Sequence, residues 1–206
     1  MTRAEDAREA ASLGAAFVGV IFAGGPRNLP VDRAAEVLGG LPSSVRRVGV
    51  FASAADDVAQ HAARLGLHAV QLHGDYDPTG VARIRRRFRG EVWAVVRIAD
   101  TRLPLYAGEL FDTVDAVLLD TKVPGKLGGT GVTLPWQELI DQIGPLREGS
   151  KARLILAGGL RPENVIEAIR LLRPDVVDVS SGVETAPGIK DHARMRAFRD
   201  AVHAST

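Results

Sequence analysis

The sequence predicts an α/β protein built on a parallel sheet. Short apolar runs rich in Val, Ile and Leu recur along the 206 residues, and amphipathic stretches separate them. Most of the runs are continuously apolar rather than alternating, which is typical of strands covered on both faces. Glycine-rich segments follow the last two runs. These observations favour a barrel of the TIM (β/α)8 type, and a doubly wound open sheet is the structural alternative.

Seven strands are expected, at 17–22, 47–51, 69–72, 92–98, 116–119, 153–156 and 177–179. Helices are expected at 4–13, 31–39, 54–65, 79–88, 101–110, 135–143, 162–172 and 191–203. Thr2 and Glu5 have the spacing of a capping box, and Gly14 suits the end of the first helix. The chain therefore opens on a helix, which is what a (β/α)8 barrel would show if its first strand were missing. No low-complexity linker divides residues 1–206, so a single domain is expected.

Composition excludes several classes of partner and site. The formal net charge is +1 and the basic residues are dispersed, so neither a nucleic acid nor a membrane surface is expected as a partner. The absence of cysteine excludes disulfides and thiolate metal sites in these residues. The histidines show no metal-ligand pairing, so no metal is expected. The apolar run 15–23 is too short to span a bilayer, and a soluble cytoplasmic protein is expected.

Two glycine-containing loops indicate a phosphate site. Gly158 and Gly159 follow the run at 153–156, and Ser180, Ser181 and Gly182 follow the run at 177–179. In barrels the loops after the last two strands commonly bind phosphate through backbone N–H groups. The alternative is that each glycine only permits a tight turn. Two such loops at the last two strand ends favour a phosphorylated small-molecule substrate.

Three side chains follow other strands at the same end of the expected barrel. Asp120 ends the run 116–119 and could donate a proton if burial raises its pKa; the alternative is that it only caps the loop through backbone amides. His73 follows Gln71 at the end of another strand, although a lone histidine is more often structural than catalytic. Arg27 follows the run at 17–22 and could hold a carboxylate in a bidentate pair, whereas an isolated surface arginine is the simpler interpretation.

Two further features each allow two interpretations. The segment 125–131, which contains Gly128 and Gly129, is long and glycine-rich, so it is expected to form a mobile loop over the substrate or to be disordered without function. Asp178 alternates with apolar neighbours and is expected either to support the phosphate loop or to lie in the core.

These motifs, in this order, resemble the phosphoribosylanthranilate isomerase family of tryptophan biosynthesis. The resemblance covers nearly the whole chain, and its two longest stretches, near the C-terminus, are specific in a way that a single glycine pair is not. The stretches that carry it are Thr2-Arg3-Ala4-Glu5-Asp6-Ala7, Pro26-Arg27, Gln71-Leu72-His73-Gly74, Leu118-Leu119-Asp120-Thr121, Gly128-Gly129-Thr130-Gly131, the segment 157–165, and the segment 178–184 followed by 187–191.

The resemblance implies a cofactor-free Amadori rearrangement of N-(5-phosphoribosyl)anthranilate to the corresponding 1-deoxyribulose phosphate. A general acid opens the furanose ring and a general base then removes the C2 proton. The implied roles are Asp120 as the acid, Arg27 as the partner of the anthranilate carboxylate, Gln71, His73, Gly128 and Gly129 as substrate-binding residues, and Gly158, Gly159, Ser180, Ser181 and Gly182 as the phosphate site.

The chain departs from the family pattern at its start. Family members usually begin with a strand that ends in Lys-x-Cys-Gly-x-Thr, whose cysteine is the base, whereas the similarity here begins at Met1. The expectation is therefore that the first strand and the base are missing, because Met1 is an internal methionine taken as the start or because the chain has been shortened. Low activity follows, since a general base contributes about 10²- to 10⁴-fold, and a homodimer through the gap is expected.

Two other functions remain open on the sequence. One is a non-catalytic phosphosugar-binding barrel whose chain truly begins at Met1. The other is a related barrel enzyme, but a phosphopentose epimerase would need metal ligands, and an imidazole-pathway isomerase would show a matching phosphate motif in the first half of the chain.

Overall fold

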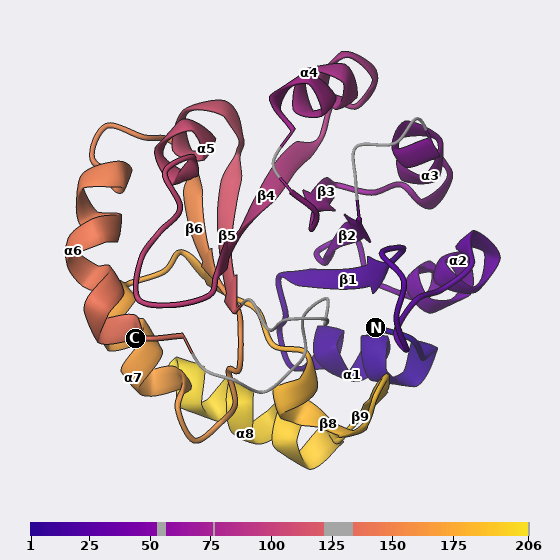
Figure 1. The fold of residues 1–206 in the computed structure, drawn as a ribbon. Helices are drawn as coiled ribbons and strands as arrows, with labels where there is room; N and C mark the ends of the chain where they lie inside the picture. The colour runs from indigo at the N-terminus through magenta and orange to yellow at the C-terminus, as the bar shows by residue number, and fades with distance from the viewer. Residues whose placement is uncertain (53–56, 76, 122–133, 206) are drawn as a thin grey trace. The chain divides into compact units, whose positions relative to one another are not determined.

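The computed structural model describes residues 1–52, 57–75, 77–121 and 134–205 (Figure 1). Within these residues one sheet holds seven strands in the order β1 to β7, and a second sheet pairs β8 with β9. The chain forms two compact units, one made of Met1–Trp93 with Thr185–His192 and the other of Ala94–Glu184 with Ala193–Thr206. The single domain over residues 1–206 stays a prediction. None of the described helices is long and apolar enough to cross a membrane.

The first unit alternates helices and strands from its first residues. β1 pairs with β2 and β2 with β3, both in parallel. Short crossover helices between these strands are what a parallel arrangement requires, because parallel neighbours cannot be joined by a tight hairpin. The elements are α1 (Ala4–Ser12), β1 (Phe17–Ile21), α2 (Val31–Gly39), β2 (Arg46–Phe51), α3 (Asp57–Leu65), β3 (Ala69–Leu72), α4 (Pro78–Arg87) and the hairpin of β8 (Glu184–Ala186) and β9 (Ile189–Lys190).

The second unit repeats this alternation. β5 pairs with β6 and β6 with β7, again in parallel. β4 (Glu91–Ile98) contributes residues to both units. The remaining elements are α5 (Ala107–Thr113), β5 (Ala116–Thr121), α6 (Trp136–Arg147), β6 (Arg153–Leu156), α7 (Val165–Leu172), β7 (Val176–Val177), the 3-10 helix η1 (Ser181–Val183) and α8 (His192–His203).

Continuous burial in β3 and β5 confirms the prediction of strands covered on both faces, whereas burial alternates in β1 and is incomplete in β7. All four residues of β3 and all six of β5 are buried. The predicted strands at 69–72 and 153–156 have the observed bounds, and those at 17–22, 47–51, 92–98 and 116–119 differ by one or two residues at one end. The predicted strand at 177–179 shares only Val177 with the observed β7. The short hairpin of β8 and β9 and the 3-10 helix η1 were not predicted.

The predicted helix at 101–110 is wrong in its first half, because α5 begins only at Ala107. Pro104 interrupts the segment and cannot donate a helical hydrogen bond. The side chain of Gln142 on α6 takes up the backbone groups instead: its Oε1 accepts the Leu103 N–H at 3.0 Å and its Nε2 donates to the Thr101 carbonyl at 2.8 Å. A tertiary contact therefore replaces the helical bonds of 101–106.

The capping box at Thr2 and Glu5 is also wrong, although the predicted stop is confirmed. Arg3 occupies the N-cap position of α1 without a side-chain cap, and Thr2 instead donates its hydroxyl to the carbonyl of Gly188. Leu13 is the C-cap residue, and Gly14 follows it with a φ of +83°, a conformation that glycine adopts without steric cost.

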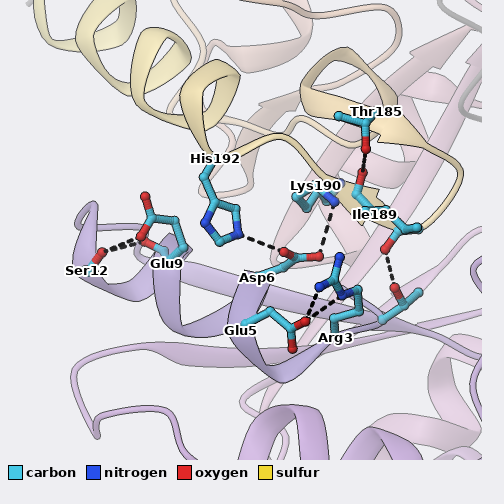
Figure 2. A network of polar contacts seen from close by, with 11 residues as sticks. Arg3, Glu5, Asp6, Glu9, Ser12, Thr185, Ile189, Lys190 and His192 are labelled. Atoms are coloured by element: carbon cyan, nitrogen blue, oxygen red, sulfur yellow. Dashed lines mark hydrogen bonds and ion pairs between the residues drawn. The ribbon is translucent and has the colours of Figure 1, made fainter.

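A buried carboxylate ties α1 to the end of the first unit (Figure 2). Asp6 is 1% exposed. Its Oδ2 accepts the backbone N–H of Lys190 at 3.1 Å, and its Oδ1 lies 2.9 Å from Nε2 of His192. Glu5, one residue earlier, instead points to Arg3 on the exposed side of the helix. Residues more than 180 positions apart in the chain are thus joined through one side chain.

We expect Asp6→Ala to lower the free energy of unfolding by about 1–3 kcal/mol, because the buried N–H of Lys190 loses its acceptor. Urea unfolding of the purified protein measures this change. Glu5→Ala is the matched control, since it also removes a carboxylate from the first turn of α1 but at an exposed position. Equal losses in the two variants would contradict the role given to Asp6.

Candidate active site

The second unit places a carboxyl group inside its core. Asp120 is the fifth residue of β5, whose other members are all buried, and it is itself 6% exposed. Its Oδ1 accepts the backbone N–H of Thr121 at 2.8 Å. The loop-capping interaction considered from the sequence therefore exists. A carboxyl group that accepts a backbone hydrogen bond on one oxygen can still carry a proton on the other, so capping does not preclude a role in proton transfer.

Burial raises the pKa of Asp120 from an ordinary value near 3.8 to about 6, because the ionised form loses hydration. The neighbouring carboxylate of Asp178 acts in the same direction. The hydrogen bond from Thr121 and the positive charge of Arg97 oppose the rise. A carboxyl group that keeps its proton to nearly neutral pH has the property that a general acid needs.

The loop after β6 passes directly beside this carboxyl group. Gly158 has a φ of +77° and Gly159 a φ of +69°. A Cβ atom on Gly158 would lie 2.8 Å from the Thr121 nitrogen and 3.0 Å from Oδ1 of Asp120. A side chain at this position would collide with the acid and with the hydrogen bond that orients it. The absence of a side chain here thus serves a close approach as well as a turn.

Asn164 fixes the shape of this loop, and the sequence did not assign it a role. Its side chain is buried, its Oδ1 accepts the N–H of Arg161 at 2.9 Å, and its Nδ2 donates to the carbonyl of Gly159 at 3.1 Å. An Asn at the start of a helix commonly bonds nearby backbone, which is a signal that could have identified it. Here it spans the loop rather than capping α7, for which no side-chain cap bond is formed.

The loop after β7 lies against the loop after β6. A Cβ atom on Gly182 would lie 1.8 Å from the carbonyl oxygen of Leu160. Arg194 on α8 donates from Nε to the carbonyl of Gly182 at 2.9 Å. Within the second unit Gly158 therefore lies against Asp120 and Thr121, and Gly182 lies against Leu160 in the loop that begins with the Gly158–Gly159 turn.

In the first unit two predicted residues form a buried pair. Gln71 is in β3 and His73 follows it, and both are at most 9% exposed. Nε2 of Gln71 lies 3.1 Å from Nδ1 of His73, and the backbone N–H of His73 bonds the carbonyl of Phe51. The sequence predicted the two residues as neighbours of a substrate but did not predict this contact between them.

Arg27 lies in a closed turn that follows β1. Gly24 and Gly25 have φ angles of +78° and +77°. The Asn28 side chain accepts the N–H of Gly24 at 3.0 Å, and the chain then returns to Ile21. The turn fixes the backbone at Arg27, whose side chain is partly exposed.

Gly128 and Gly129 lie outside the described residues, as does the loop expected to cover the substrate. Their roles stay predictions. In the described part of the chain, no group of three or more histidine, aspartate or glutamate residues is arranged to hold a metal ion.

The sequence matches the family model for N-(5'-phosphoribosyl)anthranilate (PRA) isomerase over residues 1–201. A relative from Acidithiobacillus ferrooxidans, named N-(5'-phosphoribosyl)anthranilate isomerase, is 42% identical over 96% of this chain and 92% of its own. The chain belongs to the PRA isomerase family. The family resemblance drawn from the motifs is thereby confirmed, and the protein is an isomerase.

Solved structures of PRA isomerases have the same fold. The crystal structure of the Thermotoga maritima protein has a TM-score of 0.87 at 35% identity, covering 99% of this chain and 96% of that one. A PRA isomerase in complex with reduced 1-(o-carboxyphenylamino)-1-deoxyribulose 5-phosphate has a TM-score of 0.82 at 33% identity, covering 99% and 95%. An α/β fold of the TIM type is thus confirmed over the doubly wound alternative, while the missing first strand stays a prediction.

In this PRA isomerase relative, the raised pKa of Asp120 should make stability depend on pH. Between pH 3.8 and about 6 the unfolded chain has released this proton and the folded chain has kept it, so the free energy of unfolding falls as pH rises. Above about pH 6 both states are ionised and the loss is constant. We expect Asp120→Asn to escape this loss and to become more stable than the parent, by up to about 3 kcal/mol, as pH rises from 4 to 7.

Urea unfolding of both proteins at pH 4, 5, 6 and 7 measures the difference. Asp112→Asn, at an exposed position of α5, gives the reference curve for the same substitution on the surface. A difference between Asp120→Asn and the parent that does not grow with pH would show that burial does not hold the proton on Asp120.

Proposed function

We propose that this chain converts N-(5-phosphoribosyl)anthranilate to 1-(2-carboxyphenylamino)-1-deoxyribulose 5-phosphate, an acid/base Amadori rearrangement in tryptophan biosynthesis. The observation that carries the proposal is Asp120, a buried carboxyl group whose pKa is raised to about 6, lying against the Gly158 turn. A proton donor beside a backbone suited to an anion is the combination that opening the ring of a phosphorylated sugar requires.

Asp120 acts on the furanose ring oxygen. Its neutral carboxyl gives a proton to that oxygen as the bond from the oxygen to C1 breaks, and the anthranilate nitrogen supplies the electron pair that makes the imine. A base then removes the C2 proton, and the resulting enolamine becomes the ketone. One proton is delivered and one is removed, so the product is an isomer of the substrate and no redox cofactor is needed.

The other proposed roles follow from the chemistry of each backbone or side-chain group. Backbone N–H groups of Gly158, Gly159 and the Ser180–Gly182 segment are proposed to bind the phosphate, since backbone amides in tight loops accommodate anions without a side chain. The Arg27 guanidinium is proposed to pair with the anthranilate carboxylate, as its fork matches that group. Gln71, His73, Gly128 and Gly129 are proposed to contact the substrate.

The general base of the mechanism is a cysteine according to the family resemblance, and residues 1–206 contain none. We therefore propose slow turnover for the chain as given and a much faster reaction once a strand ending in Lys-x-Cys-Gly-x-Thr precedes Met1. A homodimer likewise stays a prediction.

The non-catalytic binding barrel is the weaker alternative. A passive phosphosugar site needs anion-binding amides but has no use for a buried carboxyl group that keeps its proton to about pH 6. Burying the carboxyl group of Asp120 costs stability, and proton transfer is a function that requires it there.

We expect a chain extended by the Lys-x-Cys-Gly-x-Thr strand to convert phosphoribosylanthranilate about 10²-fold or more faster than residues 1–206 alone, because general-base catalysis is restored. In that extended chain, Asp120→Asn should lower kcat by about 10²- to 10⁴-fold, and kcat/KM of the parent should fall as pH rises through about 6. Loss of substrate fluorescence during turnover measures the rates.

Asp112→Asn in the same extended chain controls for the loss of a carboxylate at an exposed position of α5. If neither length of chain turns over although both bind the product, the binding barrel replaces the isomerase. If both lengths are equally fast, a residue within 1–206 is the base.

A further inference from the structure

The segment proposed to bind phosphate after β7 is held by a side chain that the motif analysis did not single out. Arg194 is the third residue of α8. Its Nε donates to the Gly182 carbonyl at 2.9 Å, and its Nη2 lies 3.1 Å from the carboxylate of Glu163. Glu163 comes from the segment that links β6 to α7. The guanidinium therefore spans α8, η1 and the end of the neighbouring loop.

We infer that Arg194 is a positioning residue for phosphate binding: by holding the Gly182 carbonyl, it sets the conformation in which the Ser180–Gly182 amides meet the phosphate. The inference rests on the proposed function, because it assigns a supporting residue to the phosphate site named there.

The geometry of the peptide group explains why one hydrogen bond has this effect. The carbonyl of Gly182 and the N–H of Val183 belong to the same planar trans peptide and point in opposite directions. The Val183 N–H faces the carbonyl of Ser180 at 3.5 Å and closes the 3-10 turn. Anchoring the Gly182 carbonyl on α8 therefore fixes the plane that closes this turn, and with it the orientation of the Ser181 and Gly182 amides.

Gly182 depends on such an anchor more than another residue would. It lacks a side chain because its Cα lies against the Leu160 carbonyl, where a Cβ would be 1.8 Å from the oxygen. A glycine has the largest choice of backbone conformations, so its ordering has the largest entropic cost. The loop after β6 receives a corresponding restraint from the buried amide of Asn164. The side chain of Asn164 thus bonds the backbone of the loop after β6, and the side chain of Arg194 bonds the backbone of the loop after β7.

Charge adds to the geometric effect. A guanidinium bonded to a carbonyl polarises the peptide group, and polarised chains of hydrogen bonds are stronger than isolated ones. Arginine suits this position better than lysine because its planar fork can bond the carbonyl and the carboxylate of Glu163 at once. A lysine in its place would keep the charge and one of the two contacts.

We expect Arg194→Met to weaken the binding of inorganic phosphate about tenfold, through loss of a charge-assisted hydrogen bond that orients the loop. In the extended chain, the KM for phosphoribosylanthranilate should rise by a similar factor while kcat changes less than about twofold, because the proton donor is untouched. Arg194→Lys should recover part of the phosphate affinity. Titration calorimetry with inorganic phosphate and initial rates measure these effects.

Arg199→Met is the matched control, since Arg199 lies on the same helix and its Nε lies 2.7 Å from Oδ1 of its sequence neighbour Asp200. It should leave phosphate affinity unchanged. Equal phosphate affinity in Arg194→Met and the parent would overturn the role given to Arg194 and leave the proposed phosphate site in place. A parent that binds no phosphate would overturn both the inference and the proposed phosphate site. A fall in kcat at constant KM would also contradict a positioning role. Should Arg194→Met fail to fold, Arg194→Lys decides by the same titration.

Discussion

The site depends on one physical constraint, which is that β5 carries a carboxyl group into a buried strand. A carboxylate in that position has lost most of its hydration and regains only part of it from the N–H of Thr121. The pKa rises as a consequence, and the residue keeps its proton nearly to neutral pH. The feature that makes Asp120 costly to the folded state is therefore the one that suits it to donate a proton.

The same constraint determines what surrounds the acid. Gly158 must lack a side chain because the loop after β6 passes within contact distance of Asp120. Gly182 must lack one because the next loop lies on Leu160. Glycines that allow close approach also leave the backbone with more freedom, and the structure compensates with side chains that bond the loops from outside, Asn164 in one and Arg194 in the other. In this part of the fold, each glycine that allows two backbone segments to pack closely lies in a loop that a side-chain hydrogen bond restrains.

The sequence predicted the parts of the fold that depend on local pattern. The strands at 69–72 and 153–156 were correct because their short, mainly apolar segments end close to turn-forming glycines, Gly74 after the first and Gly158 after the second. The helix at 101–110 failed because the side chain of Gln142, about 40 residues away, bonds the backbone of its first half. The cap at Thr2 failed for a similar reason, since its hydroxyl bonds Gly188 at the other end of the chain.

In the candidate site, too, the features set by local sequence pattern could be predicted and those set by contacts between distant residues could not. The position of Asp120 after an apolar run, and of the glycine pairs after the last strands, could be predicted from spacing. The close approach of Gly158 to Asp120 and the roles of Asn164 and Arg194 could not, because they are set by the way one loop packs on another. Asp6 is a further case, since its position in the sequence gives no indication of its partners near the C-terminus.

The central claim is that Asp120 retains its proton in the folded protein to nearly neutral pH. A titration of the aspartate side-chain carboxyl ¹³C resonances tests it directly, with the Asp120 signal identified by its loss in an Asp120→Asn spectrum. The account predicts a midpoint near 6 for this residue. A midpoint near the ordinary value of 3.8 would show that the carboxyl is ionised throughout the working range of pH, and it could not then be the acid that opens the ring.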